Sequence, residues 1–300
     1  MKVLYLFILF SLSTLAQSLS VVSIDKLTSN QLGSFFYPRF IKENTIAFSS
    51  PNYQGIWIRE NNSQPEQLND YSGAGYDFAF SSIDNSLLFR KNEYLNGKKY
   101  STLISFDLLS RKEKIILENQ QNILIPNLLP NSNLFYLKQN KLEKVSNSLL
   151  KNSDNIFVHA NSEGLHVYVN SSEKILKPFG EGNYIWASIS PDKQKILFNY
   201  PEKGTYVCDL NGNILFNVGR ANYPSWSRDG NWILFMRDID DGHEIIASDI
   251  YLKKYLGDVE INLTQNENMI ELFPSYSPFS DEILFNSIDG EIYKITLKFN

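Results

Sequence analysis

Cysteine is nearly absent from this sequence. Its 300 residues contain a single cysteine, Cys208. One thiol cannot form a disulfide within the chain, which excludes the small folds that depend on several disulfides. The fold must therefore be stabilised by a hydrophobic core, and we expect the Cys208 thiol to be free and buried there.

The sequence also lacks the patterns of helical and membrane-spanning proteins. After residue 16 no apolar run approaches the ~20 residues that cross a bilayer, and no long stretch has the period of an amphipathic helix. Alanine is scarce, Phe and Tyr are abundant, and Asn, Ser, Asp and Gly repeatedly interrupt short apolar runs. This composition predicts an all-β protein without membrane insertion.

Charge of one sign is not concentrated anywhere in the chain. The net charge is −5, and Lys and Arg are spread along the sequence instead of forming a basic stripe. Binding to nucleic acid depends on such a stripe to neutralise phosphates. We therefore expect no nucleic-acid partner.

The motifs of common exported enzymes are missing as well. There is no G-x-S-x-G, no H-E-x-x-H and no phosphate-binding glycine loop, and His159, His166 and His243 lack metal-ligand spacing. The acidic segment 238–242 departs from the calcium-loop pattern and has no Glu at the twelfth position, so we interpret it as a turn between strands. The sequence predicts a protein that is not an enzyme and has no cofactor and no metal.

Residues 1–16 have the pattern of a secretory signal peptide. Met1 and Lys2 give a positive start, residues 3–10 are apolar, and small and polar residues follow up to Ala16. We predict cleavage before Gln17 and a periplasmic or secreted protein whose residues 17–300 form a single domain.

A repeat organises the rest of the chain. Y-P-S-W-S-R-D-G-N-W-I-L-F at residues 223–235 aligns without gaps with F-P-S-Y-S-P-F-S-D-E-I-L-F at residues 273–285. Residues 186–198 and 77–89 fit the same frame, and degenerate copies begin near Tyr37, Ile125 and Ile156. Each unit is interpreted as a strand, a tight turn and further strands, with Gly230 supplying the positive φ of one first turn. Such units bury both faces when arranged radially, which predicts a β-propeller.

The repeat also resembles a known family. S-W-S-R-D-G-N-W-I-L-F followed by D-G-H-E-I-I-A-S-D, and L-T-Q-N-E-N-M-I-E-L-F-P-S-Y-S-P, are similar to the repeat of the TolB-type β-propellers. The resemblance is strong over residues 186–300, fair over 35–118 and poor over 122–182. It implies a propeller without the N-terminal domain of TolB, and it implies a generic partner-binding role.

The last unit has only three strands, so its fourth must come from elsewhere. Val21 to Ser29 reads V-V-S-I-D-K-L-T-S, and its K-L-T is similar to the N-L-T that ends the sixth unit. We predict that this segment pairs with Ile292 to Leu297 and closes the ring, which removes two exposed sheet edges. Seven four-stranded blades give roughly 40 residues each, and six blades are the alternative.

The first residue of each unit lies near the start of an innermost strand, at one mouth of the channel. These residues are our candidate ligand contacts: Tyr37, Asp77, Trp186, Tyr223 and Phe273. Trp186, Tyr223, Trp226 and Tyr276 could stack on a sugar or peptide, but because they recur in the register of the repeat we interpret these four rings as packing between blades.

Two functions follow from these patterns. The favoured one is a monomeric, non-enzymatic binding module for a protein or peptide partner in the envelope or outside the cell. The alternative is a carbohydrate-active or hydrolytic enzyme with its site in the channel. That alternative requires convergent His and acidic residues, for which only His159 and His166 are candidates.

Overall fold

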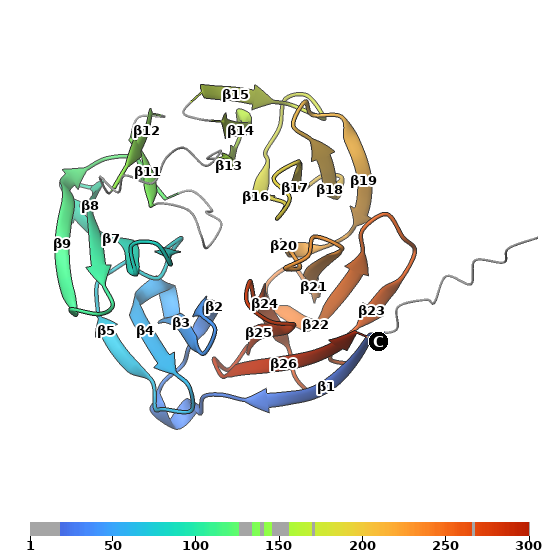
Figure 1. Cartoon of the computed structure of the whole chain (residues 1–300), viewed down its shortest axis with the longest axis horizontal. Helices are drawn as coiled ribbons and strands as arrows, with labels where there is room; N and C mark the ends of the chain where they lie inside the picture. Colours follow the sequence, from blue (N-terminus) through green and yellow to red (C-terminus); the bar gives the residue numbers. More distant parts are fainter. Residues whose placement is uncertain are drawn as a thin grey trace, which may run out of the picture.

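Seven antiparallel sheets are arranged radially around a central axis in a computed structural model of the chain (Figure 1). The structure describes residues 19–125, 134–138, 141–145, 156–169, 172–265 and 268–299. Residues 1–16, the predicted signal peptide, lie outside the described residues. The prediction of an all-β propeller with seven blades is confirmed, and six blades are excluded.

The blades follow one another along the chain. Blade 1 contains β2 (Phe36–Lys42), β3 (Thr45–Ser50), β4 (Gln54–Glu60) and β5 (Glu66–Asn69). Blade 2 contains β6 (Ala79–Ser81), β7 (Ser86–Leu95), β8 (Lys98–Asp107) and β9 (Lys112–Gln120). The degenerate middle of the sequence forms two further blades, whose described strands are β10 (Ile123–Leu124), β11 (Phe135–Lys138) and β12 (Lys141–Lys144), then β13 (Ile156–Asn161), β14 (Gly164–Val169) and β15 (Ser172–Leu176).

The C-terminal half forms the three regular blades. Blade 5 contains β16 (Ile185–Ile189), β17 (Lys195–Tyr200), β18 (Gly204–Asp209) and β19 (Ile214–Gly219). Blade 6 contains β20 (Asn222–Trp226), β21 (Trp232–Asp240), β22 (Ile245–Lys254) and β23 (Glu260–Asn262). Blade 7 contains β24 (Glu271–Tyr276), β25 (Glu282–Ser287), β26 (Ile292–Phe299) and β1 (Leu19–Lys26). Two short 3₁₀ helices, Asn30–Leu32 and Pro51–Tyr53, complete the described elements.

The predicted closure of the ring is confirmed. β1 pairs antiparallel with β26, with Val21 opposite Leu297 and Lys26 opposite Tyr293. Figure 1 shows β1 on the outer side of β26, where it supplies the fourth strand of blade 7. The hydroxyl of Thr28 also accepts a hydrogen bond of 2.8 Å from the Ile292 amide. The first and last described strands are therefore joined in one sheet, which covers the edge of β26.

The core lies between neighbouring blades, and the I-L-F sequence of each second strand explains how it forms. Side chains alternate between the two faces of a strand. In β25, Ile283 and Phe285 pack toward blade 6, whereas Leu284 packs toward Phe35 and Phe48 of blade 1. Both faces of the strand are buried, so a contiguous apolar triplet replaces the alternating pattern of a half-exposed sheet.

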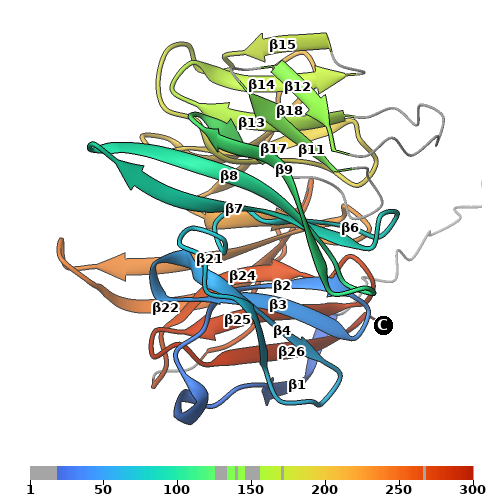
Figure 2. The same cartoon turned by 90° about the vertical axis from the view of Figure 1, so that its left-hand side faces the viewer.

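The two ends of the ring differ in the elements that they carry. Inner strands begin at one face, which we call the start face, and the second strand of each blade returns to it. The β7–β8 and β21–β22 hairpins extend beyond the ring on this side, as Figure 2 shows. The turns between first and second strands lie at the opposite face, which we call the turn face.

Candidate ligand-binding channel

The five sequence-predicted contact residues share one backbone conformation. Tyr37, Asp77, Trp186, Tyr223 and Phe273 have φ between 50° and 58°. Residues with a side chain seldom adopt this left-handed region. In all but Asp77 the residue lies within a register shift of its inner strand. Such a bulge redirects a side chain away from the regular alternation, and here the same device recurs around the ring at the start face.

Aromatic rings from four adjacent blades make a continuous series at this face. The centroids of Tyr37 and Phe273 are 4.4 Å apart, those of Phe273 and Tyr223 are 5.1 Å apart, and those of Tyr223 and Trp186 are 5.9 Å apart. Tyr53, from the 3₁₀ helix of blade 1, stacks on Tyr37 at 4.5 Å. We call these five residues the aromatic row. It brings four of the five predicted contact residues together.

A cavity of about 830 Å³ occupies the channel. Asp77, Trp186 and Tyr223 line this cavity. Tyr37 and Phe273 are not among its lining residues, but within the aromatic row Phe273 contacts Tyr223 and Tyr37 contacts Phe273. The lining continues along the inner strands to Pro191, at the turn face. The cavity thus extends along the channel, with the aromatic row at one end.

The third position of each unit supplies a second level of the wall. Strand pairing identifies it, because this residue always lies opposite the middle residue of the second-strand triplet. In the described blades the position is held by Arg39, Ala79, His159, Ser188, Ser225 and Ser275, all of which line the cavity. The three regular blades contribute small hydroxyl side chains, and blades 1 and 4 contribute a cation and an imidazole.

Arg39 is the central charge of this wall. Its Nη1 donates a hydrogen bond of 3.1 Å to the Phe78 carbonyl, and its Nη2 lies 3.8 Å from Oδ1 of Asp77. The guanidinium also lies over the Phe78 ring, 5.2 Å from its centroid. Burial raises the pKa of Tyr223, and the nearby Arg39 partly opposes this shift. Arg39 and Asp77 side chains stay about one third and one half exposed, at 35% and 45%, so both can meet a ligand.

The two histidines of the degenerate segment are neighbours, with ring centroids 5.9 Å apart. His159 lines the cavity, and its pKa is lowered by burial and by His166. His166 is fully buried behind it, with Nδ1 2.6 Å from Oε1 of Glu173 and Nε2 3.1 Å from Oδ1 of Asn161. The carboxylate therefore contacts the buried histidine and not the one that faces the channel.

Other residues singled out in the sequence have structural positions. The carboxylates of Asp240 and Asp241 accept hydrogen bonds from the amides of their own turn, which joins β21 to β22 as expected for an ordinary hairpin. Among the described residues no group of three or more His, Cys, Asp or Glu side chains is arranged to hold a metal. Cys208 is free and buried, as predicted, and burial raises its pKa to about 12.

The interpretation as inter-blade core is wrong for Trp186, which is 37% exposed and lines the cavity. Tyr223 packs against the core cluster of blades 6 and 7 and also lines the cavity. The interpretation is confirmed for Trp226 and Tyr276, each about 8% exposed. Trp226 packs edge-on against Tyr255, and Tyr276 belongs to the cluster between blades 6 and 7. At the fourth position the large ring therefore packs between blades, whereas at the first position it faces the mouth.

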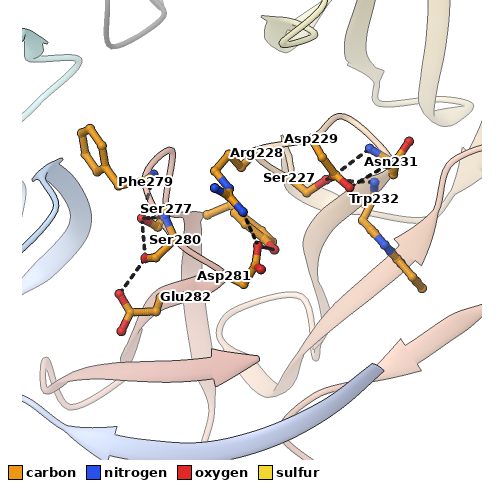
Figure 3. Close-up of polar contacts among 11 residues, drawn as sticks. Ser227, Arg228, Asp229, Asn231, Trp232, Ser277, Phe279, Ser280, Asp281 and Glu282 are labelled. Carbon is orange, nitrogen blue, oxygen red and sulfur yellow. Dashed lines mark hydrogen bonds and ion pairs between the residues drawn. The ribbon is translucent and has the colours of Figure 1, made fainter. Parts of the chain in front are cut away.

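Hydrogen-bonded turns fix the opposite mouth (Figure 3). The Ser227 hydroxyl donates to Asp229 and accepts from the Trp232 amide, at 2.6 and 2.9 Å. Gly230 has φ of 71°, as its predicted turn requires. Arg228 bridges to Asp281 of the neighbouring blade at 3.5 Å. At the turn face, hydrogen bonds hold the blade 6 turn and one ion pair joins it to blade 7.

Comparison with solved structures supports the fold. Oligogalacturonate lyase from Vibrio parahaemolyticus aligns over 93% of this chain and 96% of its own, with 13% identity and a TM-score of 0.60. The Swd1 β-propeller domain from Myceliophteria thermophila aligns over 93% and 99%, with 10% identity and a TM-score of 0.64. TolB from Acinetobacter baumannii also aligns, over 91% and 67% with 13% identity, but its TM-score of 0.49 is too low to add support.

These likenesses establish a propeller and nothing finer, because proteins with different activities share it. No family model and no characterised protein matches the sequence. Membership of the TolB-type repeat family therefore stays a prediction. No helix among the described residues is long and apolar enough to cross a membrane.

Sequence reasoning did not single out Arg39. A signal was present, because aligning the units places Arg39 where three others have serine, one has alanine and one has His159. A charged residue that departs from a repeat at a channel-lining position is a reason to suspect function.

Proposed function

We propose that the chain is an exported, non-enzymatic binding module that receives a peptide segment of an envelope or secreted protein at the start face of its channel. The observation that carries this proposal is the aromatic row, which extends across four blades beside a cavity of about 830 Å³. Rigid aromatic side chains bind with little loss of conformational entropy, which explains their enrichment at protein interfaces.

The composition of the channel wall also suits a peptide. Serine side chains at the third position in blades 5 to 7 leave room beside Trp186 and Tyr223. Across the channel, Arg39 and Asp77 offer one donor group and one acceptor group to a backbone that carries both. The closed ring presents no open edge at β26, which favours a monomer that binds through its channel and not through sheet pairing.

Site-specific crosslinking tests the proposal. A photoreactive phenylalanine analogue placed at Trp186, which is 37% exposed, should give a discrete adduct in cells of the source organism. The same analogue at Ile115, an exposed residue on the outer strand of blade 2, is the matched control. The adduct should diminish in an Arg39→Ala background. Equal labelling from both positions, or no adduct from Trp186, would count against a channel-mouth partner.

The alternative, a carbohydrate-active or hydrolytic enzyme, is favoured by one observation. His159 faces the cavity with its pKa lowered by burial, so the neutral imidazole could accept a proton. The test is incubation of the purified protein with oligogalacturonides, the substrate class named for a structural neighbour. Product formation that disappears in His159→Ala would establish this alternative and refute the non-enzymatic proposal.

A further inference from the structure

A second cavity, of about 510 Å³, lies at the start face beside blade 5. It is formed where β16 begins, where β17 turns into β18, and where β19 leads into β20. All of these points belong to the same end of the ring. Trp186 lines both this cavity and the central one, so the two adjoin at a single side chain. We call the second cavity the basic pocket.

The lining of the basic pocket contains positively charged residues and no carboxylate. Lys203 and Arg220 line it together with the side-chain amides of Asn199, Asn217 and Asn222, and no acidic residue is among its lining. Within the described part of the chain, neither cation forms an ion pair with an acidic side chain. The Lys203 ammonium lies over the Phe179 ring at 5.5 Å, and Arg220 donates to the backbone carbonyl of Asp238 at 3.3 Å.

Among the described residues, the carboxylates beside the pocket pair with neither cation. The side chain of Asp238 accepts a hydrogen bond from Asn222 at the edge of the pocket. Glu202 precedes Lys203 but belongs to the surroundings of Tyr200, whose pKa it helps to raise. Two cations are therefore left facing a hollow on a protein whose net charge is −5. An isolated basic site on an acidic protein selects for anions locally.

Trp186 supplies the apolar side of the pocket. It is the last ring of the aromatic row, and its left-handed backbone turns the side chain toward the mouth. Partner side chains that follow one another along an extended segment could meet the row, then the indole, and then the two cations. The position of the pocket at the end of the row is what makes these contacts consecutive.

We infer that the basic pocket binds an acidic side chain of the same peptide segment, seated between Lys203 and Arg220 and next to a residue packed on Trp186. This inference rests on the proposed function and names the chemistry of the partner: a segment with a Glu or Asp beside an apolar residue. The amides of Asn199 and Asn222 already donate to Thr205 and Asp238, so the carboxylate is bound by the two cations.

The test uses purified mature protein and a fluorescein-labelled hexaglutamate peptide, with binding measured by fluorescence anisotropy at low salt. Hexaglutamine with the same label is the neutral control. We expect hexaglutamate to bind at least about tenfold more tightly and to weaken as salt screens the charges. The double variant Lys203→Gln with Arg220→Gln should lose at least about threefold of this affinity, since exposed charge pairs are individually weak.

The matched control variant is Lys112→Gln with Lys114→Gln, on the exposed outer strand of blade 2, which should change the affinity by less than about twofold. Melting temperatures establish that each variant is folded. Equal binding of hexaglutamate and hexaglutamine, or an equal loss in both double variants, would overturn the inference. Binding of free glutarate without binding of hexaglutamate would overturn its assignment to a peptide.

The outcome is separable from the proposed function. Hexaglutamate binding needs no natural partner, and the Trp186 crosslink needs no acidic residue. A specific crosslink together with failed hexaglutamate binding would refute the basic pocket alone.

Discussion

Glu271 should make the stability of the propeller fall as pH rises. Its side chain begins β24 in a fully buried position, and among the described residues neither carboxylate oxygen has a hydrogen-bond partner. The corresponding residues of blades 1, 5 and 6 are Phe35, Tyr184 and Ala221, all buried. Burial, reinforced by the charge of Asp249, raises the pKa of Glu271 to about 8. The folded protein therefore holds a proton that the unfolded chain releases at ordinary carboxyl pKa.

The sign and size follow from proton linkage. The pKa of Glu271 is higher in the folded state than in the unfolded chain. The stabilisation that its proton gives the folded state is therefore fully present below the unfolded pKa of 4.5 and is lost as pH rises through the folded value of about 8. At pH 7 the loss is about 3 kcal/mol, at 1.36 kcal/mol per pKa unit. Glu271→Gln removes this titration, so its stability relative to wild type should rise by about 3 kcal/mol between pH 4.5 and pH 7.

Thermal or urea unfolding followed by tryptophan fluorescence measures this difference at each pH. For a domain of this size the change corresponds to roughly 6 °C in relative melting temperature. Glu260→Gln is the matched control, because Arg237 lies 2.9 Å from Glu260 and the pKa of Glu260 is lowered. The stabilisation from its depressed pKa is fully present above pH 4.5 and is lost only as pH falls through the folded value, so this variant should show no comparable rise between pH 4.5 and pH 7. A pH-independent difference between Glu271→Gln and wild type would refute the reasoning.

Three further predictions concern the scaffold. Deleting residues 17–29 should lower the melting temperature by roughly 10 °C, on about 5 kcal/mol for the lost β1–β26 ladder, and an unchanged value would disprove the closure. The Cys208 thiol should not react with Ellman's reagent until urea unfolds the protein, because the thiol is buried and its pKa is raised to about 12. Fast labelling of the native protein would contradict this placement. Ser227→Ala should lower the free energy of unfolding by about 1–3 kcal/mol, because it leaves the buried Trp232 amide unpaired. Ser248→Ala removes a buried hydroxyl that has no hydrogen-bond partner among the described residues, so it should be neutral or stabilising in the same unfolding assay.

The repeat made the scaffold predictable because its physical causes are local. Each of these causes acts within one unit: an apolar triplet buried on both faces, the turn at Gly230, and a missing last strand. Because the unit recurs along the chain, the sequence pattern that predicts a blade appears several times. The degenerate middle was harder, since its two blades keep the strand pairing but have lost most of the residues that mark it.

The site was less predictable because it depends on backbone conformation and on contacts between units. Nothing in an aromatic residue such as Tyr37 or Trp186 indicates φ near 50°, yet that conformation directs these side chains toward the mouth. Lys203 and Arg220 lie in connections outside the repeat frame, 17 positions apart, and only folding brings them to one hollow.

Departures from the repeat also give the channel a direction. The regular blades 5 to 7 line it with serine at the third position, and Trp186 and Tyr223 add rings at the first. The charges Arg39 and Asp77 lie in blades 1 and 2, and Arg228 of blade 6 reaches the lining at the turn face, where it pairs with Asp281. At the start face an occupant therefore meets an apolar, weakly polar wall from the regular blades and an ionic one from blades 1 and 2. A ligand that binds tightly must match this difference, because turning it over would bury a charge against the aromatic row without a partner. Sevenfold architecture thus specifies one orientation through a few residues that break its symmetry.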